Sequence, residues 1–152
     1  MKKMKLILAA VGVVLAGGVY QMNSNPSSQV KEVTVYHSPT CGCCKKWISH
    51  LEQNGFTTKS VVIDDVTPMK DKFHVPRDLS SCHTAVVDGY VIEGHVPASA
   101  INKLLTEKPS KVDGISVPGM PMGSPGMEGP YQESYEVVAF KQGAATGTFL
   151  RF

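Results

Sequence analysis

Val33-Thr34-Val35-Tyr36-His37-Ser38-Pro39-Thr40-Cys41-Gly42-Cys43-Cys44-Lys45-Lys46-Trp47 is the stretch that decides the fold. The β-branched run 33–36 is typical of a short strand, and the turn 37–40 leads into a helix-like segment from Lys45 to Asn54. Three of the four cysteines therefore lie at one strand-to-helix junction. Unpaired backbone N–H groups and the positive end of the helix dipole favour thiolate over thiol there. Because thiolates bind soft metals and attack disulfides, we expect the functional site at this junction.

The N-terminus has the polarity of an export signal. Three lysines precede Leu6–Val19, an uncharged apolar run that is shorter than the roughly 20 residues of a bilayer span. We expect residues 1–20 to be a signal peptide, residues 21–30 a linker and residues 31–152 one folded domain. An uncleaved N-terminal anchor is the alternative for the first segment. Outside the cytoplasm, thiols are oxidised in pairs unless a metal protects them.

The charge of the chain argues against nucleic-acid binding. The 152 residues include 15 basic and 13 acidic ones. Removing residues 1–20 takes away three lysines and no acids, which leaves 12 basic residues against 13 acidic ones, a net charge near −1. Nucleic-acid binding needs a concentrated positive surface, so we exclude that class.

The remaining patterns predict an α/β fold. The expected elements are a strand at 60–63, a short helix from Thr67-Pro68 to Phe73, strands at 84–87 and 90–92 joined by Asp88-Gly89, and a helix opened by Pro97. With the first strand and helix they give the order β-α-β-α-β-β-α, which resembles a thioredoxin-like domain. Residues 111–129, rich in Met, Gly and Pro, are expected to form a loop. Residues 135–140 and 146–152 are expected to close the chain as a β-hairpin.

Two interpretations of the cysteines need no metal. Two disulfides could staple a small exported domain, although only a bond to Cys82 would close a long loop. Alternatively, Cys41 and Cys44 have the C-x-x-C spacing of a thiol–disulfide oxidoreductase, in which Cys41 attacks and Cys44 resolves. The second interpretation leaves Cys43 without a role. In a thioredoxin-like fold, Cys82 would face the cluster from a position that usually carries a cis-proline.

A third interpretation is that four convergent sulfurs hold metal. Adjacent Cys43 and Cys44 cannot comfortably chelate one ion together, which disfavours a single tetrahedral zinc. Bridging several ions avoids this difficulty, and soft sulfur ligands select Cu(I). The thioethers of Met120, Met122 and Met127 also favour copper, unless they only fill a gap over the core.

The histidines are weaker indicators. His37 and His83 adjoin the cysteine segments and are candidate imidazole ligands, although each could instead hydrogen-bond a loop carbonyl. His50 is expected at the surface. His74 and His95 stand at element boundaries and are given no role.

Three motifs in order resemble the exported copper-resistance family that includes CopG. They are Tyr36–Trp47 with its C-x-C-C core, Ser81-Cys82-His83-Thr84, and Gly114-Ile115-Ser116-Val117-Pro118-Gly119-Met120-Pro121. The resemblance extends from Val33 to about Phe140. It implies a thioredoxin-like periplasmic domain that holds several copper ions on bridging cysteine sulfurs and contributes to copper tolerance. Interconversion of Cu(I) and Cu(II) is a role considered for such proteins.

We therefore expect a periplasmic protein that holds Cu(I) on Cys41, Cys43, Cys44 and Cys82. Further candidate ligands are His83, His37, Met120, Met122 and Met127. The expected partners are copper ions and other periplasmic copper-handling proteins, with a membrane only if the N-terminal segment stays uncleaved. Oxidation of Cys41 and Cys44 to a disulfide would remove two ligands at once. A thiol–disulfide oxidoreductase using these two cysteines is the alternative function, so enzymatic activity is left open.

Overall fold

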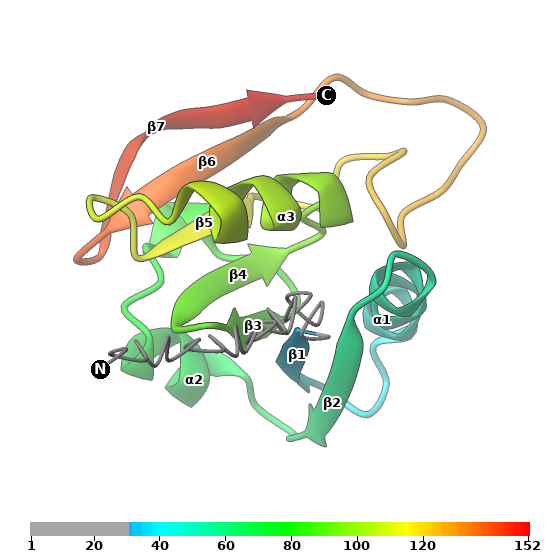
Figure 1. Cartoon of the computed structure of the whole chain (residues 1–152). Coiled ribbons are helices and arrows are strands. Elements are labelled where there is room, and N and C mark those ends of the chain that lie inside the picture. Colours follow the sequence, from blue (N-terminus) through cyan, green and yellow to red (C-terminus); the bar gives the residue numbers. More distant parts are fainter. Residues whose placement is uncertain (1–30) are drawn as a thin grey trace, which may run out of the picture.

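The computed structural model describes residues 31–152, which build one seven-stranded sheet with helices on both faces (Figure 1). In chain order, the elements are β1 (Glu32–His37), α1 (Gly42–Gln53), β2 (Thr57–Val62), α2 (Thr67–Lys72), the short 3-10 helix η1 (Arg77–Leu79), β3 (Thr84–Val87), β4 (Tyr90–Gly94), α3 (Ala98–Glu107), β5 (Gly114–Val117), β6 (Glu136–Lys141) and β7 (Ala144–Arg151). The expected mixed α/β class is confirmed, whereas a specific relationship to thioredoxin stays a prediction. The expected signal peptide and linker lie outside the described residues. None of the helices formed by residues 31–152 combines the length and apolar character that a bilayer crossing requires.

The strand order β2-β1-β3-β4-β5-β6-β7 follows from the connections. The parallel pairs β1/β2 and β4/β5 are joined by crossovers that contain α1 and α3. The antiparallel pairs β3/β4 and β6/β7 are joined by the two-residue turns Asp88-Gly89 and Gln142-Gly143. All four turn residues have positive φ, between 49° and 83°. Turns of this kind match the twist of the two strands that they connect.

Alternation along the strands divides the core between the two faces of the sheet. One face carries Val33, Val35, Ile92 and Ile115, which pack with the apolar residues of α1 and α3. The other face carries Val91 and Phe140, which the segment 73–79 covers with Phe73, Val75 and Leu79. Successive side chains of a strand point to opposite faces, so neighbouring residues such as Val91 and Ile92 serve different layers.

Helix α1 buries Cys44, Trp47 and Leu51, which share one face at helical spacing. The indole Nε1–H of Trp47 donates to the Val96 carbonyl at 2.9 Å and so ties α1 to the start of α3. His50, expected at the surface, is partly buried, and its Nε2 accepts the backbone N–H of Ala98 at 3.1 Å. It therefore caps α3, whose N-cap residue is a proline without a polar side chain.

Strand β5 corrects the expectation that residues 111–129 form only a loop. Gly114–Val117 is a buried strand between β4 and β6. Its glycine and serine suggest a loop in the sequence, but the sheet requires both of them. A Cβ at Gly114 would collide with the Phe140 ring and the Val91 carbonyl oxygen, and the Ser116 hydroxyl donates to the Leu79 carbonyl at 2.6 Å.

Replacing Gly114 by alanine should therefore destabilise the domain. Because the colliding atoms include backbone, the strands must move apart, and we expect a loss of about 1–3 kcal/mol in the free energy of unfolding. Chemical denaturation followed by circular dichroism measures this loss. Gly42→Ala is the matched control, since a Cβ at Gly42 meets nothing within 4 Å. Equal stability of the two variants would contradict the assignment of β5.

Candidate functional site

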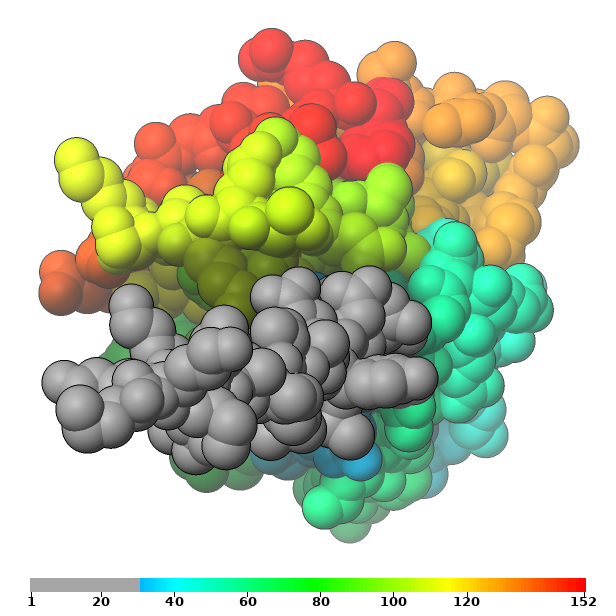
Figure 2. Space-filling view, in the orientation of Figure 1, coloured from blue at the N-terminus to red at the C-terminus, as the bar shows by residue number. Residues whose placement is uncertain are grey.

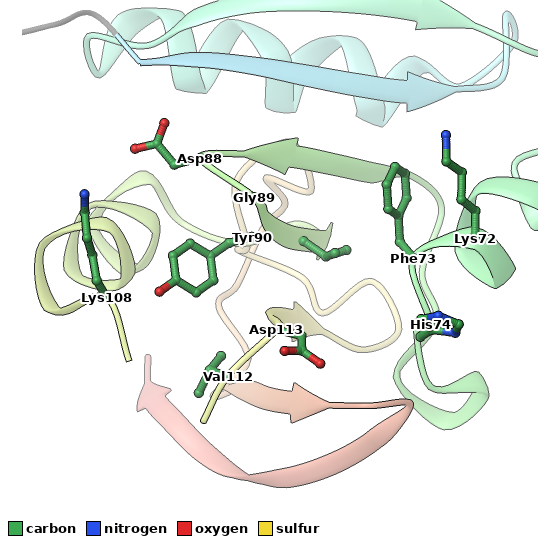
Figure 3. A pocket seen from close by; sticks show the side chains of 10 residues that line it. Lys72, Phe73, His74, Asp88, Gly89, Tyr90, Lys108, Val112 and Asp113 are labelled. Atoms are coloured by element: carbon green, nitrogen blue, oxygen red, sulfur yellow. The ribbon is translucent and has the colours of Figure 1, made fainter. Parts of the chain in front are cut away.

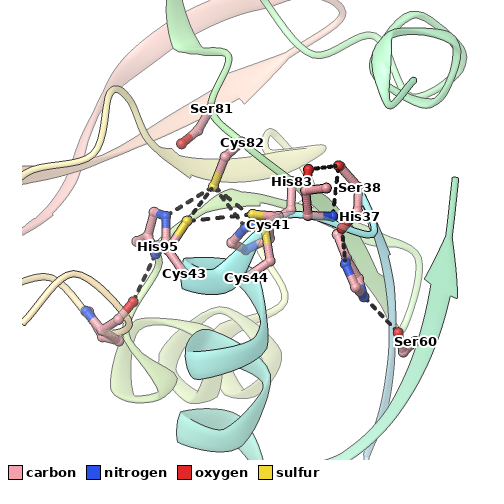
Figure 4. The surroundings of a disulfide bond; sticks show 12 residues. His37, Ser38, Cys41, Cys43, Cys44, Ser60, Ser81, Cys82, His83 and His95 are labelled. Atoms are coloured by element: carbon pink, nitrogen blue, oxygen red, sulfur yellow. Dashed lines mark hydrogen bonds between the residues drawn. A yellow bond between two sulfur atoms is a disulfide. The ribbon is translucent and has the colours of Figure 1, made fainter. Parts of the chain in front are cut away.

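The candidate site lies next to one row of paired residues that crosses strands β1, β3 and β4. Tyr36 of β1 pairs with Thr84 of β3, and Thr84 pairs with Glu93 of β4. Since both pairings are antiparallel, the end of β1, the start of β3 and the end of β4 lie at the same edge of the sheet. The segments just beyond this row carry the cysteines of α1, together with Cys82 and His95 (Figure 4).

The four cysteine sulfurs converge at this edge, all within 4.8 Å of one another. Cys41 and Cys44 are joined by a disulfide, with their Cα atoms 5.3 Å apart, whereas Cys43 and Cys82 are free thiols. The Cys43 sulfur lies 3.5 Å from that of Cys41 and 3.8 Å from that of Cys82. The Cys82 sulfur is also 3.8 Å from that of Cys44. Residues 31–152 thus contain one disulfide within a single helical turn, and not the two stapling bonds of the first interpretation.

Helix α1 aims its N-terminal end at this cluster. Cys41 is the N-cap residue and makes no side-chain capping bond, while Cys43 and Cys44 lie in the first turn. The first N–H groups of a helix have no partner within it and carry a partial positive charge. This end of the helix therefore directs N–H donors and partial positive charge toward the cysteine cluster.

Cys82 is the most perturbed thiol of the group. Burial, reinforced by the neighbouring Cys43, raises the pKa of Cys82 to about 12. Its sulfur lies 3.0 Å from Nε2 of His95 and 3.3 Å from Nδ1 of His83. Without a metal this thiol is therefore protonated and surrounded by imidazole nitrogens. A bound cation would have to displace the proton, as thiol ligands generally require.

His95, which the sequence interpretation left without a role, belongs to the site. Its side chain is completely buried, and its Nδ1–H donates to the Pro125 carbonyl at 2.9 Å. Since a carbonyl can only accept, this contact leaves the lone pair of Nε2 directed at Cys82. Burial lowers the pKa of His95, despite opposing contributions from Pro125 and Glu128, and so favours the neutral ring. Its position right after β4 was the available signal, because the two ends of a hairpin lie side by side.

His83 lies between two aromatic rings behind Cys82. Its ring centroid is 4.4 Å from that of Trp47 and 5.1 Å from that of His95. Burial, followed by the nearby His95, lowers the pKa of His83 well below its usual range. Its Nε2 is the one buried side-chain polar atom among residues 31–152 that has no hydrogen-bond partner. Cys82, His83 and His95 form a second group whose donor atoms lie within 4.8 Å of one another.

The side chain of His37 is hydrogen-bonded to groups other than the cysteines. Its Nδ1 contacts the Ser38 carbonyl at 2.9 Å, and its Nε2 contacts the Ser60 hydroxyl at 2.6 Å. Both ring nitrogens therefore have partners in the turn after β1 and in β2. This arrangement matches the alternative in which His37 bonds a loop carbonyl.

The Met-rich loop, residues 118–129, lies beside the cysteine cluster, and Figure 2 shows gold to orange residues on the surface next to the teal residues of α1. At one end of the loop, the Ser81 hydroxyl donates to the Gly119 carbonyl at 2.7 Å. At the other end, Gly126 sits so close to α1 that a Cβ would lie 2.7 Å from the Cys43 carbonyl oxygen. These contacts anchor the loop on both sides of the cluster.

The three methionines of this loop differ in exposure. Met120, next to the anchored Gly119, is 52% exposed. Met122 and Met127 are partly buried, and the Met122 side chain packs over Gly129 within the loop itself. Met120 and Met127 thus follow the two anchored glycines directly, whereas Met122 packs within the loop.

A pocket of about 740 Å³ lies elsewhere, around the Asp88-Gly89 turn (Figure 3). This turn is at the opposite end of the β3/β4 hairpin from Cys82 and His95. The pocket mixes lysines with acidic residues, and the Asp113 carboxylate on its wall already accepts from the Gln142 N–H at 2.8 Å. Its lining therefore does not single out a ligand.

Two solved structures are similar to the chain. One is titled "Copper resistance protein copG- Form 2"; it is 44% identical, covers 80% of this chain and 98% of its own, and superposes with a TM-score of 0.74. The other, titled "Copper resistance protein copG- Form 1", is also 44% identical, covers 80% of this chain and 96% of its own, and gives a TM-score of 0.73. The family described as "Protein of unknown function, DUF411" matches residues 79–127, which contain Cys82, His95 and the three methionines of the loop. A comparison with curated proteins finds no match.

Proposed function

Since the chain belongs to the CopG family of copper-resistance proteins, we propose that its cysteine cluster binds Cu(I) and thereby contributes to copper resistance. The observation that carries this proposal is the convergence of four cysteine sulfurs within 4.8 Å. Soft thiolates select Cu(I), and Cu(I) accepts the low coordination numbers of shared sulfurs. Several ions bridged by thiolates also give the adjacent Cys43 and Cys44 separate roles.

The donors at this edge of the sheet fit copper better than a hard cation. They are cysteine sulfurs and imidazole nitrogens, and neither group of donors described above contains a carboxylate. Cys41, Cys43, Cys44 and Cys82 would hold the ions, and His95 would add a neutral imidazole, with His83 behind it. Met120 and Met127 would control access at the rim. Copper bound there would supply a one-electron Cu(I)/Cu(II) couple beside a two-electron dithiol.

The disulfide between Cys41 and Cys44 fits a release step in this proposal. A disulfide supplies no thiolate, so the oxidised chain keeps only Cys43 and Cys82 as thiol ligands. Reduction restores the other two. The reduced chain is therefore the copper-binding form, and oxidation of this pair would lower its copper capacity.

The proposal also includes export to the periplasm. Its support is the sequence pattern of residues 1–20, in which lysines precede an uncharged apolar run. Copper-handling proteins of the same compartment would then deliver or receive the ions.

Removing Cys43 should lower the copper content of the reduced protein. Cys43 lies between Cys41 and Cys82, so its sulfur is the natural bridge between them. We expect several copper ions per chain in the reduced wild type and fewer in Cys43→Ser, measured by elemental analysis after anaerobic loading. The wild type with its disulfide intact is the control for ligand number. Less than one copper per wild-type chain, or unchanged copper in the variant, would contradict the bridging site.

Removing the imidazole of His95 should weaken copper binding without removing sulfur. We expect His95→Leu to lower the Cu(I) affinity by about tenfold or more, measured by competition with a chromogenic Cu(I) chelator. X-ray absorption of the loaded protein should lose a nitrogen scatterer in parallel. His74→Asn is the matched control, because His74 is exposed, has a φ of 53° that asparagine tolerates, and belongs to neither donor group. Equal affinities in both variants would remove His95 from the ligand set.

Thiol–disulfide exchange is the second candidate function, favoured by the Cys41–Cys44 disulfide at the N-terminus of α1. If copper binding is the main function, wild type and Cys41→Ser should reduce insulin at the same slow rate in the presence of dithiothreitol. The enzyme hypothesis requires a different pattern. Fast turnover would then survive loss of Cys43 and Cys82 and vanish without Cys41.

A further inference from the structure

The buried carboxylate of Glu93 is hydrogen-bonded to Ser81, the residue before Cys82. The side chain of Glu93 has no exposed surface, although an unpaired buried charge is strongly unfavourable. Its Oε1 accepts from the Lys70 ammonium at 2.5 Å and from the Ser81 backbone N–H at 2.6 Å. Its Oε2 accepts from the Thr84 hydroxyl at 2.7 Å. These partners come from α2 (Lys70), from β3 (Thr84) and from the segment before β3 (Ser81), and none comes from β4 itself.

These contacts hold the segment that carries Cys82 from both sides. Ser81 immediately precedes Cys82, and Thr84 follows it by two positions. Lys70 completes the arrangement, because its ammonium also donates to the Thr84 hydroxyl at 3.1 Å. Residues 80–84 contain no proline to fix their backbone, so its path depends on these hydrogen bonds together with those of Ser81 to Gly119 and of the Gly94 N–H to the His83 carbonyl.

Stability alone does not account for such a pair. Replacing a buried ion pair by apolar residues of similar volume is often neutral or stabilising. Groups outside the first coordination layer, in contrast, commonly orient metal ligands. The Cys82 sulfur needs such orientation, since it lies 3.8 Å from both Cys43 and Cys44 and 3.0 Å from His95.

From this geometry we propose that Glu93 is a positioning residue, which with Lys70 fixes the Cys82 sulfur against the other cysteines. The purpose of this positioning rests on the proposed copper function. The positioning itself is a property of the metal-free chain and can be measured there.

Two double variants separate the hydrogen bonds of Glu93 from its charge. Both remove the ion pair through Lys70→Met. One combines it with Glu93→Gln, which keeps an acceptor for the Ser81 N–H, and the other with Glu93→Leu, which keeps none. Thermal unfolding of both variants shows whether each one folds. A difference between them then reports the acceptor and not the loss of charge.

The first measurement uses metal-free protein with the Cys41–Cys44 disulfide intact and Cys43→Ser added, so that Cys82 is the one free thiol among residues 31–152. We expect iodoacetamide to alkylate Cys82 about tenfold faster in the variant with Glu93→Leu than in the variant with Glu93→Gln. Without an acceptor for the Ser81 N–H, residues 80–84 should open locally more often. Glu136→Gln is the control, since its carboxylate pairs with Arg151 at the surface, far along the chain from Cys82.

The second measurement uses the reduced chain with all four cysteines. In a chelator competition, we expect Cu(I) to bind about tenfold more weakly to the variant with Glu93→Leu than to the variant with Glu93→Gln. Equal alkylation rates and equal affinities would overturn the positioning role. If the wild type binds no copper but the alkylation rates differ, the proposed function fails while the positioning stands.

Discussion

The antiparallel pairing of β3 with both β1 and β4 is the constraint on which the site depends. It places Tyr36, Thr84 and Glu93 in one row, so that three chain segments leave the sheet at the same edge. A slip of one residue between β1 and β3 would turn Thr84 and its neighbours to the opposite face. The cluster of cysteine sulfurs would then lose Cys82. The chemistry at this edge thus follows from strand register as much as from the cysteines themselves.

The residues of the site that could be predicted are those marked by short sequence patterns. The C-x-C-C run follows an apolar strand and opens a helix, and the Asp88-Gly89 turn identifies the hairpin that brings Cys82 to the same edge. His95 has only a weak signal, its position right after the second strand of the hairpin, and β5 has none. A single histidine between a strand and a helix looks the same whether it is exposed or buried, and its burial depends on the loop that packs over it. In β5, the glycine that fits against Phe140 gives the strand the composition of a loop.

In the proposed copper function, the environment of the thiols would link metal binding to the redox state of the cysteines. Burial disfavours an ionised Cys82, and a nearby positive charge is what offsets that cost. A soft cation bound between the sulfurs would provide such a charge, and the neutral rings of His83 and His95 add no positive charge that would repel it. Once the cation is lost, Cys41 and Cys44 can remain reduced or form a disulfide. The structure of residues 31–152 has the closed form.

The short span of this disulfide has a consequence for the scaffold. Its two cysteines are three positions apart, in the first turn of a helix. The stabilisation that a cross-link provides grows with the length of chain that it encloses, and here that length is minimal. On the chain-entropy model, closing so short a loop stabilises the fold by about 2 kcal/mol, against about 5 kcal/mol for a loop of about 100 residues. The sheet and its two apolar layers therefore hold the domain together in both covalent states, and the bond acts mainly on the sulfurs of the site.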